Sequence, residues 1–307
     1  MIHTPPCPLC RSETHPFFGN ADALLECREC GVVIDTRVTV NKETYESLVT
    51  SWKDRERIQS RKRDARQRIA LARKYLHKSH SMLEIGCAGC YFLDEVKGLV
   101  NSVKGIEPSA FYSDYAQKEL KLDVKQSGIE DASFPPASFD VVALFSVFEH
   151  LVDPIGALKK IHEWLKPKGF LILEMPNIQC PSARHKGINW MHIHDEHRFH
   201  FGPGSIEKLL NRYGFEIVSI RSRDFNQYRI GIGKSIRKLF LSLPSHNATA
   251  IASKGNKKAS ETQKSSPSRL KKMRKALQLP VTALLGWLVL KFNKGDNLFV
   301  IARKKPA

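Results

Sequence analysis

One stretch decides the fold of this chain: Ser81-Met-Leu-Glu-Ile-Gly-Cys-Ala-Gly-Cys-Tyr-Phe-Leu-Asp-Glu95. Its apolar start has the length of a buried strand, its middle consists of small residues, and its end resumes an apolar pattern at helical spacing. This order predicts a strand, a tight turn and the start of a helix. Small residues in such a turn let a ligand approach the backbone, and the amides at the start of the helix would point towards that ligand.

A second strand follows at the distance expected for a nucleotide site. The apolar run Val103-Lys-Gly-Ile106 ends in Glu107, twenty-one residues after Gly86. A carboxylate at the end of this strand is able to accept hydrogen bonds from the two hydroxyl groups of a ribose. The turn, the strand and the delayed acid together predict a nucleotide-type binding site.

Four further motifs follow in order along the chain. They are Gly105-Ile-Glu-Pro108, Phe134-Pro-Pro-Ala-Ser-Phe-Asp140, Ser146-Val-Phe-Glu-His-Leu151 and Leu165-Lys-Pro-Lys-Gly-Phe-Leu-Ile-Leu-Glu-Met-Pro-Asn177. With them the run from Leu83 to Asn177, about a third of the chain, resembles the class I S-adenosylmethionine-dependent methyltransferases. The resemblance implies S-adenosyl-L-methionine as cofactor. It also implies ten cofactor-binding residues: Glu84, Gly86, Cys87, Ala88, Gly89, Glu107, Ile129, Glu130, Phe145 and Ser146.

The sequence departs from the family pattern in the cofactor region. Two glycines of the family are replaced by Ala88 and Cys90, and the usual acid on the adenine side falls on Gly128. Adenine would then depend on backbone amides or on Glu130. These departures support one alternative interpretation, a non-catalytic binding module that keeps the fold with a degenerate cofactor site.

Apolar strand patterns and helical patterns alternate through the core. This alternation predicts an α/β fold with a doubly wound, Rossmann-like parallel sheet, and its ligand lies at the carboxyl ends of the strands. We expect strands near 82–86, 102–107, 122–125, 139–145, 169–175, 214–220 and 297–302, and helices near 91–99, 109–120, 154–166 and 205–213. A helical insertion separates the last two strands.

The chain divides into five predicted parts. These are a zinc ribbon at 1–37, a basic leading helix within 38–80, a methyltransferase core at 81–230 with a substrate loop at 177–204, a basic amphipathic insertion at 231–295, and the last core strand with its tail at 296–307. The leading helix carries an apolar stripe of Ile58, Ala65, Ile69, Ala72 and Leu76. We expect this stripe to pack on the core and to leave the arginines outward.

Four cysteines near the start of the chain form two Cys-x-x-Cys pairs. Cys7 and Cys10 are separated from Cys27 and Cys30 by sixteen residues, which is the spacing of a zinc site on two knuckle turns. A disulfide alternative requires an oxidising compartment, and nothing in the sequence directs the chain to one. Four thiolates close the coordination shell, so this Zn²⁺ is predicted to be structural.

A third Cys-x-x-Cys pair, Cys87 and Cys90, lies in the turn described first. At a helix start in this context such a pair can be a redox centre. Small residues lining a cofactor turn explain the pair more simply.

Two segments carry nearly all of the net charge of +18. Residues 51–80 contain eleven Lys and Arg against three Asp and Glu, and residues 231–275 contain twelve against one. Such segments favour an anionic partner, either a nucleic acid or an acidic membrane face. A solvated helix face and a disordered loop are the simpler alternatives.

The insertion has the composition of an interfacial membrane segment. Basic residues at 269–275 precede a Trp- and Leu-rich stretch at 277–290, which contains a proline and is too short to span a bilayer. Packing on the sheet of the enzyme or on a partner subunit is the alternative. The first residues do not have the pattern of a signal peptide. We therefore expect a cytoplasmic protein, peripheral on the inner face of the membrane.

The predicted substrate loop holds five of the twelve histidines: His185, His192, His194, His197 and His200. Titratable groups so dense beside a cofactor pocket suit a general base that takes a proton from a hydroxyl group. The alternatives are a metal cluster of His192, His194 and Asp195, and an anchoring role for His197 and His200, which the resemblance favours. With His150, which follows Glu149 at the end of a strand motif, the catalytic candidates are His150, His194 and His200.

These observations predict an S-adenosylmethionine-dependent methyltransferase that O-methylates a small molecule, a sugar or a lipid-linked intermediate. The rival within enzymes is an RNA methyltransferase that uses the ribbon and the basic segments to bind phosphates. It is less favoured because the ribbon itself is nearly neutral and the insertion combines its charge with an apolar stretch.

Overall fold

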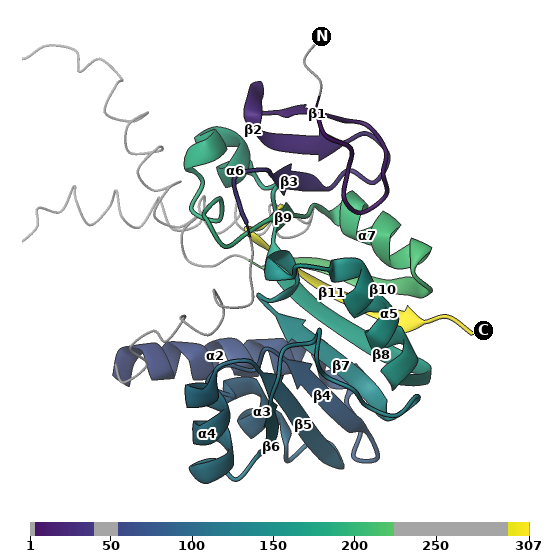
Figure 1. The fold of residues 1–307 in the computed structure, drawn as a ribbon. Helices are drawn as coiled ribbons and strands as arrows, with labels where there is room; N and C mark the ends of the chain where they lie inside the picture. Colours follow the sequence, from purple (N-terminus) through teal and green to yellow (C-terminus); the bar gives the residue numbers. More distant parts are fainter. Residues whose placement is uncertain (1–3, 40–54, 224–293, 307) are drawn as a thin grey trace, which may run out of the picture. The chain divides into compact units, whose positions relative to one another are not determined.

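A seven-stranded mixed sheet in the order β10-β11-β8-β7-β4-β5-β6 is the centre of the fold (Figure 1). A computed structural model describes residues 4–39, 55–223 and 294–306 of the chain. The five strands β4 to β8 run parallel, and β11 lies antiparallel between β8 and β10. The bounds are β4 Ser81–Ile85, β5 Ser102–Glu107, β6 Asp123–Gln126, β7 Phe139–Phe145, β8 Leu165–Pro176, β10 Phe215–Arg223 and β11 Asn297–Lys304. The predicted Rossmann-like α/β fold is confirmed.

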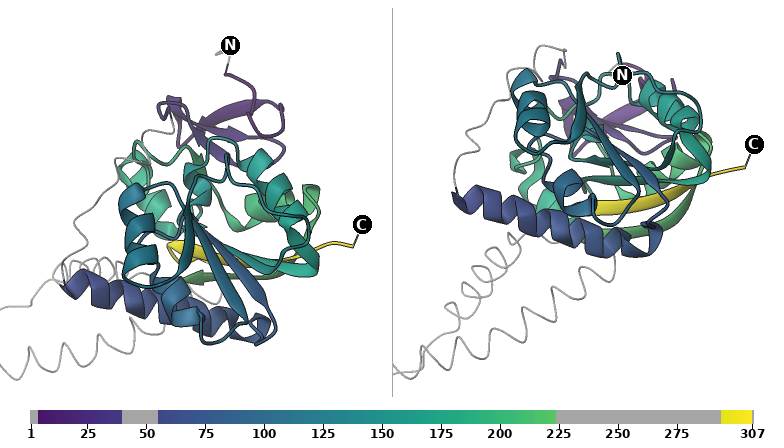
Figure 2. Two further views of the ribbon diagram at one scale, coloured as in Figure 1. Left: turned by 60° about the horizontal axis from the view of Figure 1, so that its bottom comes forward. Right: turned by 90° about the horizontal axis from the view of Figure 1, so that it is seen from below.

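Helices cover both faces of this sheet (Figure 2). On one face α2 and α3 pack on Met82, Val141 and Ile172. On the other face α5 and α7 pack on the neighbouring residues of the same strands, because successive side chains of a strand point to opposite faces. The helices are α2 Arg55–Ala72, α3 Tyr91–Val96, α4 Ala110–Lys118, α5 Pro154–Trp164, α6 Pro181–Lys186 and α7 Pro203–Arg212, with short 3₁₀ turns η1 Arg73–Tyr75, η2 Phe148–His150 and η3 Gly187–Asn189.

The N-terminal part forms a second, four-stranded antiparallel sheet in the order β1-β2-β3-β9. Its own strands are β1 Thr14–Phe17, β2 Asn20–Cys27 and β3 Val33–Asp35, and β9 Phe199–His200 comes from the predicted substrate loop. Val32 and Ile34 of the ribbon share an apolar cluster with Phe199 and with Ile206 of α7. The ribbon therefore binds the predicted substrate loop through strand pairing and apolar packing. The sequence did not predict this contact.

One expectation for the leading helix is wrong. Ala65 and Ala72 are buried as the apolar stripe predicts, but Arg68 does not point to solvent. Its side chain is only 13% exposed and forms an ion pair with Glu174 of β8 at 2.7 Å. Residue 68 lies one turn from both alanines, so it shares the face that packs on the sheet. A buried acid in β8 explains why a cation is tolerated there.

Several predictions fall on residues outside the described ranges. These are the start of the leading segment at 40–54 and nearly the whole insertion at 231–295, of which the structure describes Lys294 and Gly295. The parts of the chain that are described contain no helix with the length and apolar character needed to cross a membrane.

Candidate functional site

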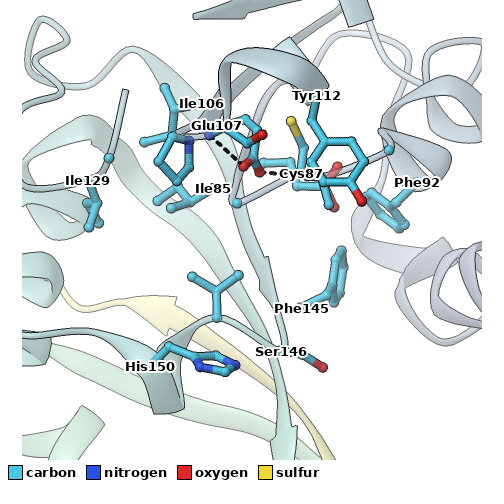
Figure 3. A pocket seen from close by; sticks show the side chains of 18 of the residues that line it. Ile85, Cys87, Phe92, Ile106, Glu107, Tyr112, Ile129, Phe145, Ser146 and His150 are labelled. Carbon is cyan, nitrogen blue, oxygen red and sulfur yellow. Dashed lines mark hydrogen bonds between the residues drawn. The ribbon is translucent and has the colours of Figure 1, made fainter. Parts of the chain in front are cut away.

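A cavity of about 390 Å³ opens at the carboxyl edge of the parallel strands (Figure 3). Ile85, Glu107 and Phe145, the last residues of β4, β5 and β7, all line it. Parallel strands bring their carboxyl ends to one edge, so residues far apart in the sequence meet there. All ten residues predicted to bind the cofactor line this cavity: Glu84, Gly86, Cys87, Ala88, Gly89, Glu107, Ile129, Glu130, Phe145 and Ser146.

The turn between β4 and α3 depends on left-handed backbone. Gly86 has a φ of +69°, and a Cβ atom there would lie 2.5 Å from Cγ2 of Val147. Ala88 and Cys90, the two positions at which the family has glycine, have φ of +43° and +56°. A non-glycine residue in this region costs about 1 kcal/mol, so the chain keeps the shape of the turn with some strain.

Glu107 is held by two backbone amides. Its Oε2 atom accepts a hydrogen bond from the amide of Ala88 at 2.8 Å, and Oε1 accepts one from the amide of Ser109 at 3.0 Å. The side chain is 6% exposed, and burial raises the pKa of its carboxyl group while the two amides oppose that rise. The carboxylate is thus fixed at the wall of the cavity and connects the end of β5 to the turn after β4.

Arg68 and Glu84 line the cavity, and Arg68 belongs to a buried charge network behind it. Arg68 donates to Glu174 at 2.7 Å and lies over the ring of Phe145 at 4.6 Å, and Arg223 also pairs with Glu174. Glu84 is 4% exposed, and burial raises its pKa to about 8. Within the described residues its Oε2 atom has no hydrogen-bond partner. Such an atom is costly to bury unless a ligand donates to it.

Arg61 and Arg68 of α2 line the cavity, and the sequence interpretation missed both. The signal for Arg68 was its place beside the apolar stripe of the leading helix. Tyr91, Phe92 and Tyr112 also line the cavity and were not predicted. They follow the two predicted strands directly, where side chains of the next helices lean over the strand ends.

Residues 128–130 line the part of the cavity that is predicted to hold adenine. Gly128 and Glu130 line the cavity together with Ile129, which is 4% exposed. A Cβ atom at position 128 would lie 2.9 Å from Oε2 of Glu130. A larger residue there would have to displace that carboxylate, so glycine at 128 and the acid at 130 fit one another.

The three histidines predicted as catalytic occupy different places. His150 lines the cavity and faces Glu107 from the opposite side in Figure 3, whereas His194 and His200 are not among the lining residues. His200 lies in β9, is 2% exposed and pairs with Val33 of the ribbon. This placement fits the anchoring alternative, and a catalytic role of His194 and His200 stays a prediction.

The rings of His150, His194 and His197 are in contact. Ring centroids are 4.4 Å apart for His150 and His197 and 3.9 Å apart for His194 and His197. Burial lowers the pKa of His150 to about 4, so the ring is neutral at pH 7. In the described part of the chain, His192, His194 and Asp195 do not form a convergent ligand set, so this predicted metal alternative is wrong.

The four cysteines of the ribbon converge. One sulfur from each of Cys7, Cys10, Cys27 and Cys30 lies within 4.8 Å of the others, with Cys7 to Cys30 at 3.8 Å and Cys10 to Cys27 at 3.3 Å. Four sulfurs bound to one zinc ion at ~2.3 Å lie at a similar mutual distance. The donor set therefore fits a tetrahedral zinc site.

Cys87 and Cys90 are both buried, and their sulfurs are 3.3 Å apart. The hydrogen-bonding contact between the Cys87 thiol and the Cys90 sulfur, together with burial, raises the pKa of the Cys87 thiol well above its usual value. A reactive thiolate needs the opposite shift, so the redox alternative is not supported.

Known proteins resemble this chain in sequence and in fold. The Methyltransferase domain family matches residues 55–220, more than half of the chain. A ubiquinone biosynthesis O-methyltransferase from Cereibacter sphaeroides is 27% identical over 158 residues, which cover 47% of this chain and 64% of that protein. A tRNA U34 carboxymethyltransferase from Desulfotalea psychrophila is 33% identical over 108 residues, which cover 33% of this chain and 34% of that protein. The matched regions thus span between about a third and two thirds of these curated relatives.

Among solved structures, one chain of the complex between the Haloferax volcanii Trm112 methyltransferase activator and a methyltransferase gives a TM-score of 0.54. It is 13% identical, and the match covers 88% of this chain and 100% of that chain. At this identity the likeness concerns the fold.

Proposed function

This chain belongs to the class I S-adenosylmethionine-dependent methyltransferases, and from this premise we propose that it O-methylates a small molecule, a sugar or a lipid-linked intermediate. The observation that carries the proposal is the cavity between Glu107 and His150. One side offers an acceptor for a ribose, and the other offers a neutral nitrogen base. Binding of S-adenosylhomocysteine by the purified protein, followed by labelled-methyl transfer to cell fractions, tests it.

The residues that line the cavity fit the cofactor. Glu107 is placed to accept both ribose hydroxyl groups while it keeps its two backbone amides, since each carboxylate oxygen has two lone pairs. The unsatisfied Oε2 atom of Glu84 suits the amino group of the methionyl part, and Arg61 and Arg68 suit its carboxylate. Ile129 and Glu130 are assigned to the adenine.

His150 is the histidine placed to act on the acceptor. Its Nδ1 atom is 2.9 Å from the backbone oxygen of Glu196, which can only accept, so Nδ1 carries the proton and the basic lone pair of the ring lies on Nε2. When bound, S-adenosylmethionine supplies a methyl group on a positively charged sulfur, and the sulfur keeps the bonding electrons when that group leaves. Nε2 takes the proton of the acceptor hydroxyl group as its oxygen bonds to the methyl carbon.

His194 and His200 are proposed as supporting residues. His194 contacts the ring of His197, and His200 lies in the strand that joins the loop to the ribbon. Their alanine variants should lower turnover less than the His150 variant does. If alanine at all three positions leaves turnover within about threefold, the general-base proposal is wrong.

Zn²⁺ in the ribbon is proposed to be structural. The four thiolates leave no open position for a substrate, and β3 next to the site pairs with β9 of the loop. Zinc would therefore stabilise the segment that follows β8, at a distance from the reaction itself.

The acceptor is proposed to be presented at an anionic membrane surface, which the basic and apolar composition of residues 231–295 supports. The relative named as a ubiquinone biosynthesis O-methyltransferase supports O-methylation as the reaction. The second candidate is RNA, favoured by the relative named for tRNA U34 and by the charge of +18. Label in the lipid or small-molecule fraction and flotation with anionic vesicles support the first candidate, and label in RNA supports the second.

A further inference from the structure

A group of three side chains includes one residue of the cavity wall, His150, and two residues that do not line the cavity. Glu149 and His150 belong to η2, which follows β7, and His197 comes from the loop before β9. One ligand atom from each of the three lies within 4.8 Å of the other two. Two of these residues come from one strand end and the third from a segment nearly fifty residues later, so tertiary folding has brought them together.

Glu149 is the residue that most needs an explanation. It is 1% exposed, and neither of its carboxylate oxygens has a hydrogen-bond partner among the residues that the structure describes. A buried carboxyl group without a partner destabilises the folded protein, and more so if it is charged. Natural proteins place such groups where an ion, a water or a ligand completes them.

Each of the two histidines has a backbone oxygen beside its Nδ1 atom, as many metal-bound histidines have. His150 Nδ1 donates to the backbone oxygen of Glu196 and His197 Nδ1 donates to that of His192, both at 2.9 Å. A backbone oxygen has no proton to donate, so in both rings Nε2 carries the lone pair. A histidine that binds a metal through one nitrogen usually donates from the other to a carbonyl or carboxylate, which fixes its tautomer.

We infer that Glu149, His150 and His197 form a binding site for a divalent transition-metal ion. Ligands bound to one ion at about 2.1 Å lie roughly 3 to 3.5 Å apart, and the ligand atoms of this group lie within 4.8 Å of one another before any ion is bound. Two imidazoles and one carboxylate leave coordination positions open, and this set suits ions such as Mn²⁺, Fe²⁺, Co²⁺ and Zn²⁺. The site differs from the four-cysteine site of the ribbon and shares no residue with it.

The role of this ion rests on the proposed methyltransferase activity. His150 lies in both the ligand group and the cavity wall, so an open position of the ion would face the acceptor. A hydroxyl group bound to the ion loses its proton more readily, because the cation stabilises the alkoxide. Nε2 of His150 cannot bind the ion and take the proton at the same time. In the metal-bound enzyme the proton therefore leaves to solvent, and the ion replaces His150 as the activating group.

Mn²⁺ titration of the zinc-loaded, full-length protein tests this inference. Free Mn²⁺ is followed by electron paramagnetic resonance, because Mn²⁺ prefers oxygen and nitrogen ligands and leaves the zinc of the ribbon in place. The matched variants are Glu149→Gln and His197→Gln, with His185→Gln as control, since His185 is exposed and outside the group. Glutamine at 149 copies the shape of the protonated acid, so folding should be retained.

We expect one Mn²⁺ to bind per chain, with affinity reduced at least tenfold in both variants and unchanged in the control. Failure of the zinc-loaded wild-type protein to bind either Mn²⁺ or Co²⁺ would overturn the inference, as would wild-type affinity in both variants. S-adenosylhomocysteine titrations of the same proteins separate the two proposals. Cofactor binding without metal binding rejects only the ion, and metal binding without cofactor binding rejects only the methyltransferase proposal.

Discussion

Replacing Glu107 with glutamine removes one acceptor from a position that needs two. The carboxylate accepts hydrogen bonds from the amides of Ala88 and Ser109 at 2.8 and 3.0 Å. Glutamine has one carbonyl oxygen, so its NH₂ group would face one of these N–H donors. We therefore expect Glu107→Gln to lower the free energy of unfolding by about 1 to 3 kcal/mol, through the loss of one hydrogen bond to a charged group.

Cofactor affinity should fall by a similar free energy. The glutamine also loses one of the two charge-assisted bonds to the ribose, worth about 1.5 to 3 kcal/mol, which corresponds to a roughly 10- to 150-fold higher dissociation constant. S-adenosylhomocysteine titration measures the affinity, and urea unfolding measures the stability. Glu207→Gln is the matched control, because Glu207 is exposed on α7 outside the cavity. Wild-type affinity in a folded Glu107→Gln protein would refute the role of this carboxylate.

Three further predictions follow from other contacts. Ala88→Gly should raise the free energy of unfolding by about 1 kcal/mol, because residue 88 has a φ of +43°, which glycine adopts without strain. Ala110→Gly should lower it, because residue 110 lies in helix α4, where glycine is less favourable than alanine. Urea unfolding of the two variants measures both effects. Burial raises the pKa of Glu84 from 4.5 to about 8, so its stabilising contribution is complete below pH 4.5 and is lost as the pH rises through about 8. Between pH 5 and 8 the free energy of unfolding should therefore decline less in Glu84→Gln than in the wild type, by at most about 5 kcal/mol. An equal decline in both proteins would contradict the raised pKa of Glu84. Removing zinc with a chelator or by Cys27→Ser should lower the melting temperature and increase amide exchange in β9 more than in β4, since β9 pairs with the ribbon; equal exchange would contradict this coupling.

The parts of the fold that follow local rules could be predicted from the sequence. The turn after β4 was recognisable because its small residues directly follow a buried strand, and Glu107 because an acid ends the next strand. The cysteine spacing predicted a convergence that the structure contains. In each of these cases the chemistry lies within a short run of residues or in a fixed spacing.

The parts that depend on long-range packing could not be predicted. Arg68 belongs to a strongly basic helix, and only the presence of Glu174 on the facing strand shows why it is buried. The pairing of β9 with the ribbon joins two segments far apart in the sequence through a two-residue strand, which leaves no periodic pattern. The meeting of Glu149 with His197 has the same origin, and the metal alternative considered from the sequence was instead His192, His194 and Asp195, which are neighbours along the chain.

The central claim is that this chain binds S-adenosylmethionine in the cavity between Glu107 and His150. Isothermal titration of the purified, zinc-loaded protein with S-adenosylmethionine and S-adenosylhomocysteine tests it most directly. We predict one bound molecule per chain with micromolar affinity for each compound. An absence of binding in protein that is folded by circular dichroism would contradict the claim and favour a binding module that keeps the fold without the cofactor.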